Sequence, residues 1–205
     1  MTLPVLVPLR GGDTAIVRRE TFPHGRRRVT IDHRPLEGVT PGEVLDWFRS
    51  LGSTMEYGGR TVPRYLAWHP IDHLRWELAR PAPGGGAAEG ARFHIVERFG
   101  GRPENEVDVV DTVEKLDETG IRLVQRVAGV VIFQLEHTWS AGRGRTHYLS
   151  VLDLGARNPF FAPVNRRLIR RFPDQLVQAW VRHNIEEVGQ LEYLLPRLSM
   201  VGSAC

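Results

Sequence analysis

Residues 173–195, PDQLVQAWVRHNIEEVGQLEYLL, form the stretch that decides the fold. Apolar residues recur in it every three or four positions, which predicts a long amphipathic helix that we place at 172–196. At 100° per residue, Leu176, Leu191 and Leu194 fall within about 60° of one another. This side of the helix is therefore expected to face the interior.

His183 and Glu187 lie one turn apart on this same apolar side, whereas Glu186 points elsewhere and is expected to be solvated. A carboxylate on an inward face is costly unless it is paired or binds a metal. A His and a Glu at positions i and i+4 can supply two ligands to a metal. A buried His–Glu hydrogen bond explains the pattern equally well.

Upstream of this helix, the sequence has the pattern of β-strands separated by turns rich in Gly, Pro and Asp. The expected strands are 15–19, 28–32, 65–69, 74–79, 92–99, 107–113, 121–127, 130–139 and 146–152. An early helix is expected to begin after Thr40, because Thr40 and Glu43 form a capping-box pattern around Pro41.

This layout predicts an α+β fold in one domain, 1–205, with an extended N-terminal segment at 1–35. A run of antiparallel strands followed by a long helix favours a curved sheet wrapped around that helix. We expect a cavity between the two.

Composition excludes several classes of protein. The 205 residues are 41% hydrophobic and 25% charged, as in ordinary globular proteins, and no apolar run is long enough to span a membrane. The single cysteine, Cys205, excludes a disulfide framework, and the proline-broken N-terminus is a poor signal peptide, so a cytoplasmic protein is expected. The net charge is +3, but acidic residues are interspersed among the arginines, so no nucleic-acid partner is expected.

A second segment with metal-ligand residues runs from Tyr65 to Trp76 and contains His69, Asp72 and His73. Pro70 prevents the two histidines from forming a helical pair. One of them could bind a metal while Asp72 orients it, and a metal-free Asp–His turn is the alternative. The segment alone does not choose between His69 and His73.

A third segment, the strand at 92–99, places Glu97 on the same face as Phe93 and Ile95. An inward Glu97 is a candidate ligand or catalytic carboxylate, and a solvated glutamate at the strand end is the alternative. Glu104 and Glu106 follow in a polar turn, where exposure is expected.

These segments, in this order, resemble the 2,4-diacetylphloroglucinol hydrolase family, which includes the phloretin hydrolases. The resemblance is carried by 65–73, 94–97 and 183–189. It implies a helix-grip (START-like, SRPBCC) fold and a zinc-dependent enzyme that hydrolyses the carbon–carbon bond between an acyl group and a phenolic ring.

The same resemblance implies roles for individual residues. The zinc ligands map onto His73, Glu97, His183 and Glu187. Tyr65 matches a tyrosine that contacts the substrate eight residues before the first zinc histidine, and His137 and Tyr148 match further pocket residues more loosely. A different placement of the gap in the turn at 81–90 would put Glu104 or Glu106 in the third ligand position.

The expected function is therefore hydrolysis of an acyl-phloroglucinol or phloretin-like ketone by water that Zn²⁺ activates, with Tyr65, His137 and Tyr148 holding phenolic oxygens or delivering a proton. The expected partner is a small-molecule phenolic ketone, and a homodimer is compatible with the resemblance.

Two other functions compete: a metal-free protein that binds an aromatic or lipid ligand, and a polyketide cyclase or aromatase of the same fold. Two buried carboxylates opposite two histidines favour the metal enzyme over the carrier.

Overall fold

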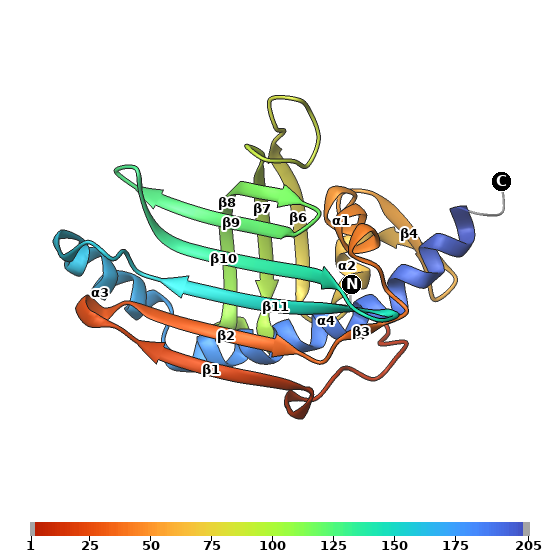
Figure 1. Cartoon of the computed structure of the whole chain (residues 1–205), viewed down its shortest axis with the longest axis horizontal. Coiled ribbons are helices and arrows are strands. Elements are labelled where there is room, and N and C mark those ends of the chain that lie inside the picture. The colour runs from red at the N-terminus through yellow and green to blue at the C-terminus, as the bar shows by residue number, and fades with distance from the viewer. Residues whose placement is uncertain (1–2, 203–205) are drawn as a thin grey trace.

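The computed structural model describes residues 3–202 (Figure 1), so Cys205 lies outside the described residues. A curved antiparallel sheet of nine strands packs against the long helix α4 (Asp174–Gly202). Along the sheet the strand order is β1-β2-β11-β10-β9-β8-β7-β6, and β3 pairs with β11. This is the helix-grip arrangement, and the expected α+β fold is confirmed.

The strands agree with the sequence pattern over most of the sheet. They are β1 (Ala15–Thr21), β2 (Arg27–His33), β3 (Leu36–Glu37), β6 (His73–Arg80), β7 (Arg92–Arg98), β8 (Glu106–Asp117), β9 (Gly120–Val127), β10 (Val130–Ala141) and β11 (Arg145–Leu154). The extended segment expected at 1–35 contains β1 and β2. The expected helix at 172–196 corresponds to α4, which runs further, to Gly202.

Helix α1 (Pro41–Arg49) begins as its capping box predicts. The Thr40 side chain accepts a hydrogen bond from the Glu43 backbone N–H, and the Glu43 carboxylate accepts one from the Thr40 N–H. Trp47 and Phe48 are buried in the core on the face of α1 opposite its polar residues. Figure 1 shows α1 with α2 (Arg64–Trp68) and the hairpin β4–β5 (Thr54–Tyr57 and Arg60–Pro63) at one end of the sheet, and α3 (Ala162–Arg171) at the other.

The strand expected at 65–69 is wrong. Residues 65–68 belong to a short helix, α2 (Arg64–Trp68), and His69 follows its end. The helix ends before His69 because the residue that precedes Pro70 is disfavoured in the helical conformation, and His69 is extended. The indole N–H of Trp68 donates a hydrogen bond to the Glu187 carbonyl oxygen at 2.8 Å, which fixes α2 on α4. The contact of Trp68 with α4 favours a helical conformation for 64–68, and the local sequence pattern does not contain this information.

Helix α4 is buried on more than its apolar stripe. Leu191 and Leu194 are fully buried in one hydrophobic cluster, and Ile185 belongs to a second. Gly189 faces the N-terminal segment, where a Cβ atom would lie 2.4 Å from Cδ of Arg10. That close approach lets Arg10 form an ion pair with Glu192 at 2.7 Å. The N-terminal segment and the sheet therefore cover different sides of the same helix.

Within residues 3–202, the structure contains no helix with both the length and the apolar character needed to cross a bilayer.

Candidate metal centre

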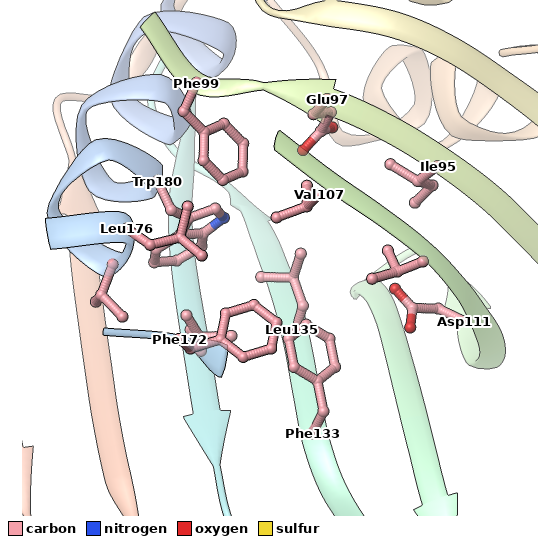
Figure 2. Close-up of a pocket in the computed structure, with 13 residues that line it drawn as sticks. Ile95, Glu97, Phe99, Val107, Asp111, Phe133, Leu135, Phe172, Leu176 and Trp180 are labelled. Carbon is pink, nitrogen blue, oxygen red and sulfur yellow. The ribbon is translucent and has the colours of Figure 1, made fainter. Parts of the chain in front are cut away.

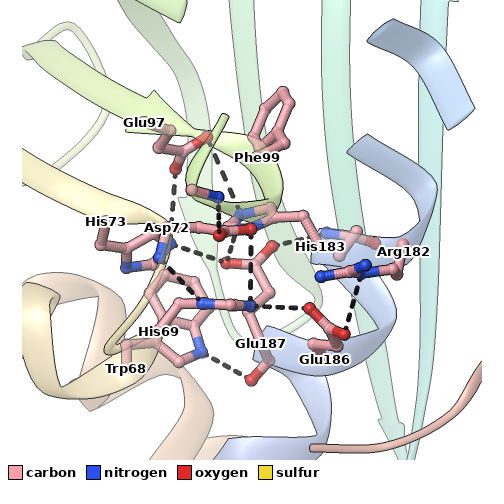
Figure 3. Close-up of polar contacts among 12 residues, drawn as sticks. Trp68, His69, Asp72, His73, Glu97, Phe99, Arg182, His183, Glu186 and Glu187 are labelled. Carbon is pink, nitrogen blue, oxygen red and sulfur yellow. Dashed lines mark hydrogen bonds and ion pairs between the residues drawn. The ribbon is translucent and has the colours of Figure 1, made fainter. Parts of the chain in front are cut away.

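Two histidines and two glutamates from three elements meet at the middle of α4 (Figure 3). His73 begins β6 and is paired in register with Glu97 of β7, while His183 and Glu187 come from α4. The His73 Nε2 atom lies 3.4 Å from Glu97 Oε1 and 3.5 Å from Glu187 Oε2. The His183 Nε2 atom lies 3.8 Å from Glu97 Oε2 and 3.7 Å from Glu187 Oε2. We call these four residues the His–Glu cluster.

Each imidazole of the cluster is oriented from its far side. Nδ1 of His73 lies 2.7 Å from the carbonyl oxygen of Tyr65, and Nδ1 of His183 lies 3.1 Å from Oδ2 of Asp72. Both partners accept, so each ring carries its proton on Nδ1 and turns the lone pair of Nε2 towards the carboxylates. The buried Nε2 atom of His73 has no hydrogen-bond partner among the described residues.

This arrangement fits a divalent cation. Two neutral imidazoles and two carboxylates are a donor set that zinc accepts, and a histidine that binds a metal usually donates its other N–H to a carbonyl or carboxylate. Four ligands about 2.0–2.2 Å from one centre lie about 3.3–3.6 Å apart. The distances of 3.4 to 3.8 Å between the nitrogens and carboxylate oxygens of the cluster are close to that spacing and too long for strong hydrogen bonds.

Burial shifts the pKa of every cluster residue towards its neutral form. Desolvation raises the pKa of Glu97 to about 7, although the nearby His73 lowers it, and raises that of Glu187 to about 8. Desolvation also lowers the pKa of His73 to about 4 and holds that of His183 well below its ordinary value. Two carboxylates that ionise at this depth require a compensating positive charge, and no Lys or Arg among the described residues forms an ion pair with them.

Glu186 corrects one expectation, because it is not solvated. Its relative exposure is 8%, and Oε2 lies 3.1 Å from Nε2 of His69 while Oε1 pairs with Arg182 at 3.1 Å. The sheet covers one side of α4 and the loop after α2 covers the other, so residues 183–188 are all buried. The expectation for Glu186 assumed that only one face of the helix is buried. In this part of α4 both faces are covered, and Arg182 is the exposed residue next to the buried run 183–188.

The two histidines of the 65–76 segment have different positions. The structure places His73 in the cluster and His69 outside it, against Glu186. Nδ1 of His69 accepts a hydrogen bond from the Asp72 N–H at 3.2 Å, so Nε2 donates to Glu186. Asp72 accepts from His183 and from the Gly101 N–H. Burial alone would raise the pKa of Asp72, but the hydrogen bond from His183, the electrostatic effects of His183 and His69 and a backbone hydrogen bond together outweigh burial and lower the pKa to about 2.

The other two glutamates proposed for the third position lie outside the cluster. Glu104 is exposed in a short 3-10 helix, Pro103–Asn105. Glu106 forms hydrogen bonds of 2.9 and 2.6 Å with Arg98. Of the three candidates, the structure brings Glu97 to the two histidines.

Tyr65 lies directly beside the cluster. Its hydroxyl donates to Oε1 of Glu97, and its ring stacks on the His73 imidazole with centroids 3.9 Å apart and planes 4° apart. Burial and the nearby Glu97 hold the pKa of Tyr65 well above 10, so the hydroxyl keeps its proton. Tyr65 therefore both supports His73 and supplies a proton donor next to Glu97.

His137 and Tyr148 lie on the inner face of the sheet, on β10 and β11. Nδ1 of His137 and Nε2 of His33 each lie 2.9 Å from the Ser150 hydroxyl. The buried Tyr148 hydroxyl has no hydrogen-bond partner among the described residues. Burial raises its pKa, and Glu187 adds to that effect. His33 and Ser150 were not predicted as site residues, although their alternation with more exposed residues on β2 and β11 marks both as inward.

A cleft leads from Glu97 along the inner face of the sheet (Figure 2). Its walls are almost wholly apolar, with Phe133 and Leu135 from β10 on one side and Leu176 and Trp180 from α4 on the other. The cleft, including its open mouth, holds about 560 Å³ of empty space, little of which is wide enough for a water molecule, so the cleft is narrow.

Comparisons with known proteins show no family for the chain. No protein-family model matches it, and no curated protein matches it. Among solved structures, it is similar to Ara h 8.0201, with 11% identity over 89% of this chain and 99% of that one and a TM-score of 0.49. It is also similar to protein Ms6760 from Mycobacterium smegmatis (9% identity, 86% and 97% coverage, TM-score 0.46). A START superfamily protein from Mycobacterium smegmatis is similar as well (13% identity, 80% and 97% coverage, TM-score 0.37).

Proposed function

We propose that this chain is a zinc-dependent hydrolase that cleaves the carbon–carbon bond between an acyl group and a polyhydroxylated aromatic ring. The observation that carries the proposal is the His–Glu cluster, in which two imidazoles with fixed Nδ1 protons face two buried carboxylates. The resemblance of the motifs to 2,4-diacetylphloroglucinol and phloretin hydrolases supports the reaction and the substrate class. The homodimer and the cytoplasmic location stay predictions.

His73, Glu97, His183 and Glu187 would hold the cation. When bound, a divalent cation supplies Lewis acidity towards the acyl carbonyl and lowers the pKa of a coordinated water. Asp72 and the Tyr65 carbonyl fix the tautomer and the orientation of the two imidazoles.

The remaining groups bind the substrate and move protons. The Tyr65 hydroxyl keeps its proton at neutral pH and lies against Glu97, so it can hold a phenolic oxygen or protonate the ring carbon that loses the acyl group. Tyr148, whose hydroxyl has no hydrogen-bond partner among the described residues, is a second donor on the sheet side of Glu187, and His137 lies beside it. The apolar walls of the cleft exclude water and accept an aromatic ring.

A metal-free carrier of an aromatic or lipid ligand is the second candidate, and the apolar cleft favours it. A carrier has no use for two carboxylates that must be desolvated opposite two histidines. A polyketide cyclase or aromatase would use acid–base residues such as Tyr65 and His137 without a metal.

The deciding experiment combines metal analysis with a product assay. Protein purified without chelator is expected to contain about one zinc per chain and to release a carboxylic acid from phloretin or an acylated phloroglucinol, with phloroglucinol identified by chromatography against a standard. Removal of the metal should abolish turnover, and added Zn²⁺ should restore it. Metal-free protein that binds these ketones and does not hydrolyse them when Zn²⁺ is added would favour the carrier.

A further inference from the structure

The cleft has a second carboxyl group at the end remote from the His–Glu cluster. Asp111 of β8 is 2% exposed and lines the cleft together with Val107 and Val109 of the same strand. Figure 2 shows its carboxyl group among apolar side chains. Gln125 donates a hydrogen bond to Oδ1 at 2.8 Å, the only side-chain hydrogen bond to this carboxyl among the described residues. Such a group needs a further partner, because a buried carboxylate with one hydrogen bond is costly.

The register of the sheet sets the distance between the two ends of the cleft. Glu97 pairs with Val107, and Asp111 is four residues further along β8. Four residues of an antiparallel strand span about 13–14 Å. The lining between these two carboxyl groups is apolar and the cleft is narrow.

We propose that Asp111 determines substrate specificity by binding a hydroxyl group at the far end of an elongated, narrow and mostly apolar ligand. The near end of this ligand lies at Glu97, and its identity as the acyl ketone rests on the proposed function. The contact between the hydroxyl and Asp111 does not depend on the proposed function, because it can be measured as binding without turnover.

A hydroxyl fits this end better than an ammonium group. An ammonium has three N–H donors to satisfy, and the only side chains with hydrogen-bond acceptors that line the cleft within the described residues are Asp111 and Glu97, at opposite ends. Burial raises the pKa of Asp111 to about 6, although Gln125 lowers it. A hydroxyl can donate to the ionised carboxylate or accept from the protonated acid, so it binds Asp111 in either state.

The test compares two ligands that differ only at the far end. The probes are phloretin and its analogue that lacks the hydroxyl on the ring remote from the ketone, titrated by calorimetry against metal-free protein, which does not turn them over. We expect the wild-type protein to bind phloretin about tenfold more tightly than the analogue, since a hydrogen bond to a charged group gives at least this ratio. In Asp111→Leu the ratio should fall to about one while the analogue binds no more weakly. Asp111→Asn should keep most of the ratio, because its amide oxygen still accepts.

Asp108→Asn is the matched control, since Asp108 lies on the outer face of the same strand and pairs with His94. It should leave the ratio unchanged. Equal binding of both probes by the wild-type protein, no binding of either, or a ratio that survives in folded Asp111→Leu would overturn the proposal. Tighter binding of the analogue with an amino group at that position would overturn the choice of hydroxyl. Absence of hydrolysis with the binding ratio intact would instead reject the proposed reaction and leave the role of Asp111 standing.

Discussion

Replacement of Glu187 by glutamine separates a metal ligand from a packing residue. Glutamine keeps the size of the side chain and an oxygen that can accept the hydrogen bond from the Asn184 amide, which is 2.6 Å long. It removes the negative charge that an ionised Glu187 would present to a cation held with His73 and His183. The substitution therefore has opposite effects on the metal-free and the metal-loaded protein if Glu187 is a metal ligand.

In the metal-free protein, Glu187→Gln is expected to be stabilising at neutral pH. Burial raises the pKa of Glu187 from 4.5 to about 8, so the folded state binds this proton more tightly than the unfolded state does. The stability that the protonated carboxyl allows is complete below pH 4.5 and is lost as the pH rises towards 8. pH 7 lies about 2.5 units above the ordinary pKa of 4.5, so at pH 7 the free energy of unfolding is about 3 kcal/mol lower than at pH 4 because of this group. Glutamine has no proton to lose, so the variant should gain up to about 3 kcal/mol at pH 7 and about nothing at pH 4.

In the presence of zinc the effect reverses. Loss of one of two carboxylate ligands should weaken zinc binding by about 100-fold or more, which removes about 2.7 kcal/mol of metal-dependent stabilisation at a fixed zinc concentration above the Kd of the variant. Hydrolysis should be lost as well. Without metal, Glu187→Gln should thus be more stable than the wild-type protein at pH 7. Added zinc should raise its free energy of unfolding by less than it raises that of the wild-type protein.

Urea unfolding at pH 4 and pH 7, with Zn²⁺ or with chelator, measures these free energies, and elemental analysis measures the bound metal. Glu104→Gln, at an exposed residue outside the cluster, is the control and should change neither. If Glu187 only accepts a hydrogen bond in the core, Glu187→Gln keeps that acceptor and should leave both the zinc content and the stabilisation by zinc unchanged. That pattern would refute the assignment of Glu187 as a ligand.

Three further changes have distinct expected effects. Asp72→Asn should lower zinc affinity about 10–100-fold while the fold persists, because it weakens the partner that orients His183; competition with a chromogenic chelator measures this. Tyr65→Phe should keep the zinc content but lower kcat for hydrolysis by about 100-fold or more, since it removes a proton donor next to Glu97; steady-state kinetics on zinc-loaded protein would contradict this if kcat were unchanged. Leu194→Ala should cost about 2–5 kcal/mol in urea unfolding and leave zinc affinity unchanged, because this fully buried side chain packs in the core away from the cluster.

The order of elements and the inward direction of several site residues could be predicted from local pattern. The 3.6-residue period put His183 and Glu187 on the buried side of α4, the two-residue alternation put Glu97 on the inner face of β7, and the capping box located the start of α1. The same alternation on β8 puts Asp111 on the inner face with Val107 and Val109, although Asp111 was not among the predicted site residues. These signals are local, because backbone geometry alone decides which side chains share a face.

The environment of those side chains was decided only by tertiary structure. Glu186 is buried because a loop from 69–72 closes over the side of α4 that the sheet leaves open, and no periodicity in α4 contains that information. The choice of His73 over His69 depends on where α2 ends and on the pairing of His73 with Glu97 across 23 intervening residues. The sequence determines which residues can face inward, whereas the distances, proton positions and pKa shifts of the cluster come from segments far apart in the chain that desolvate one another only when packed.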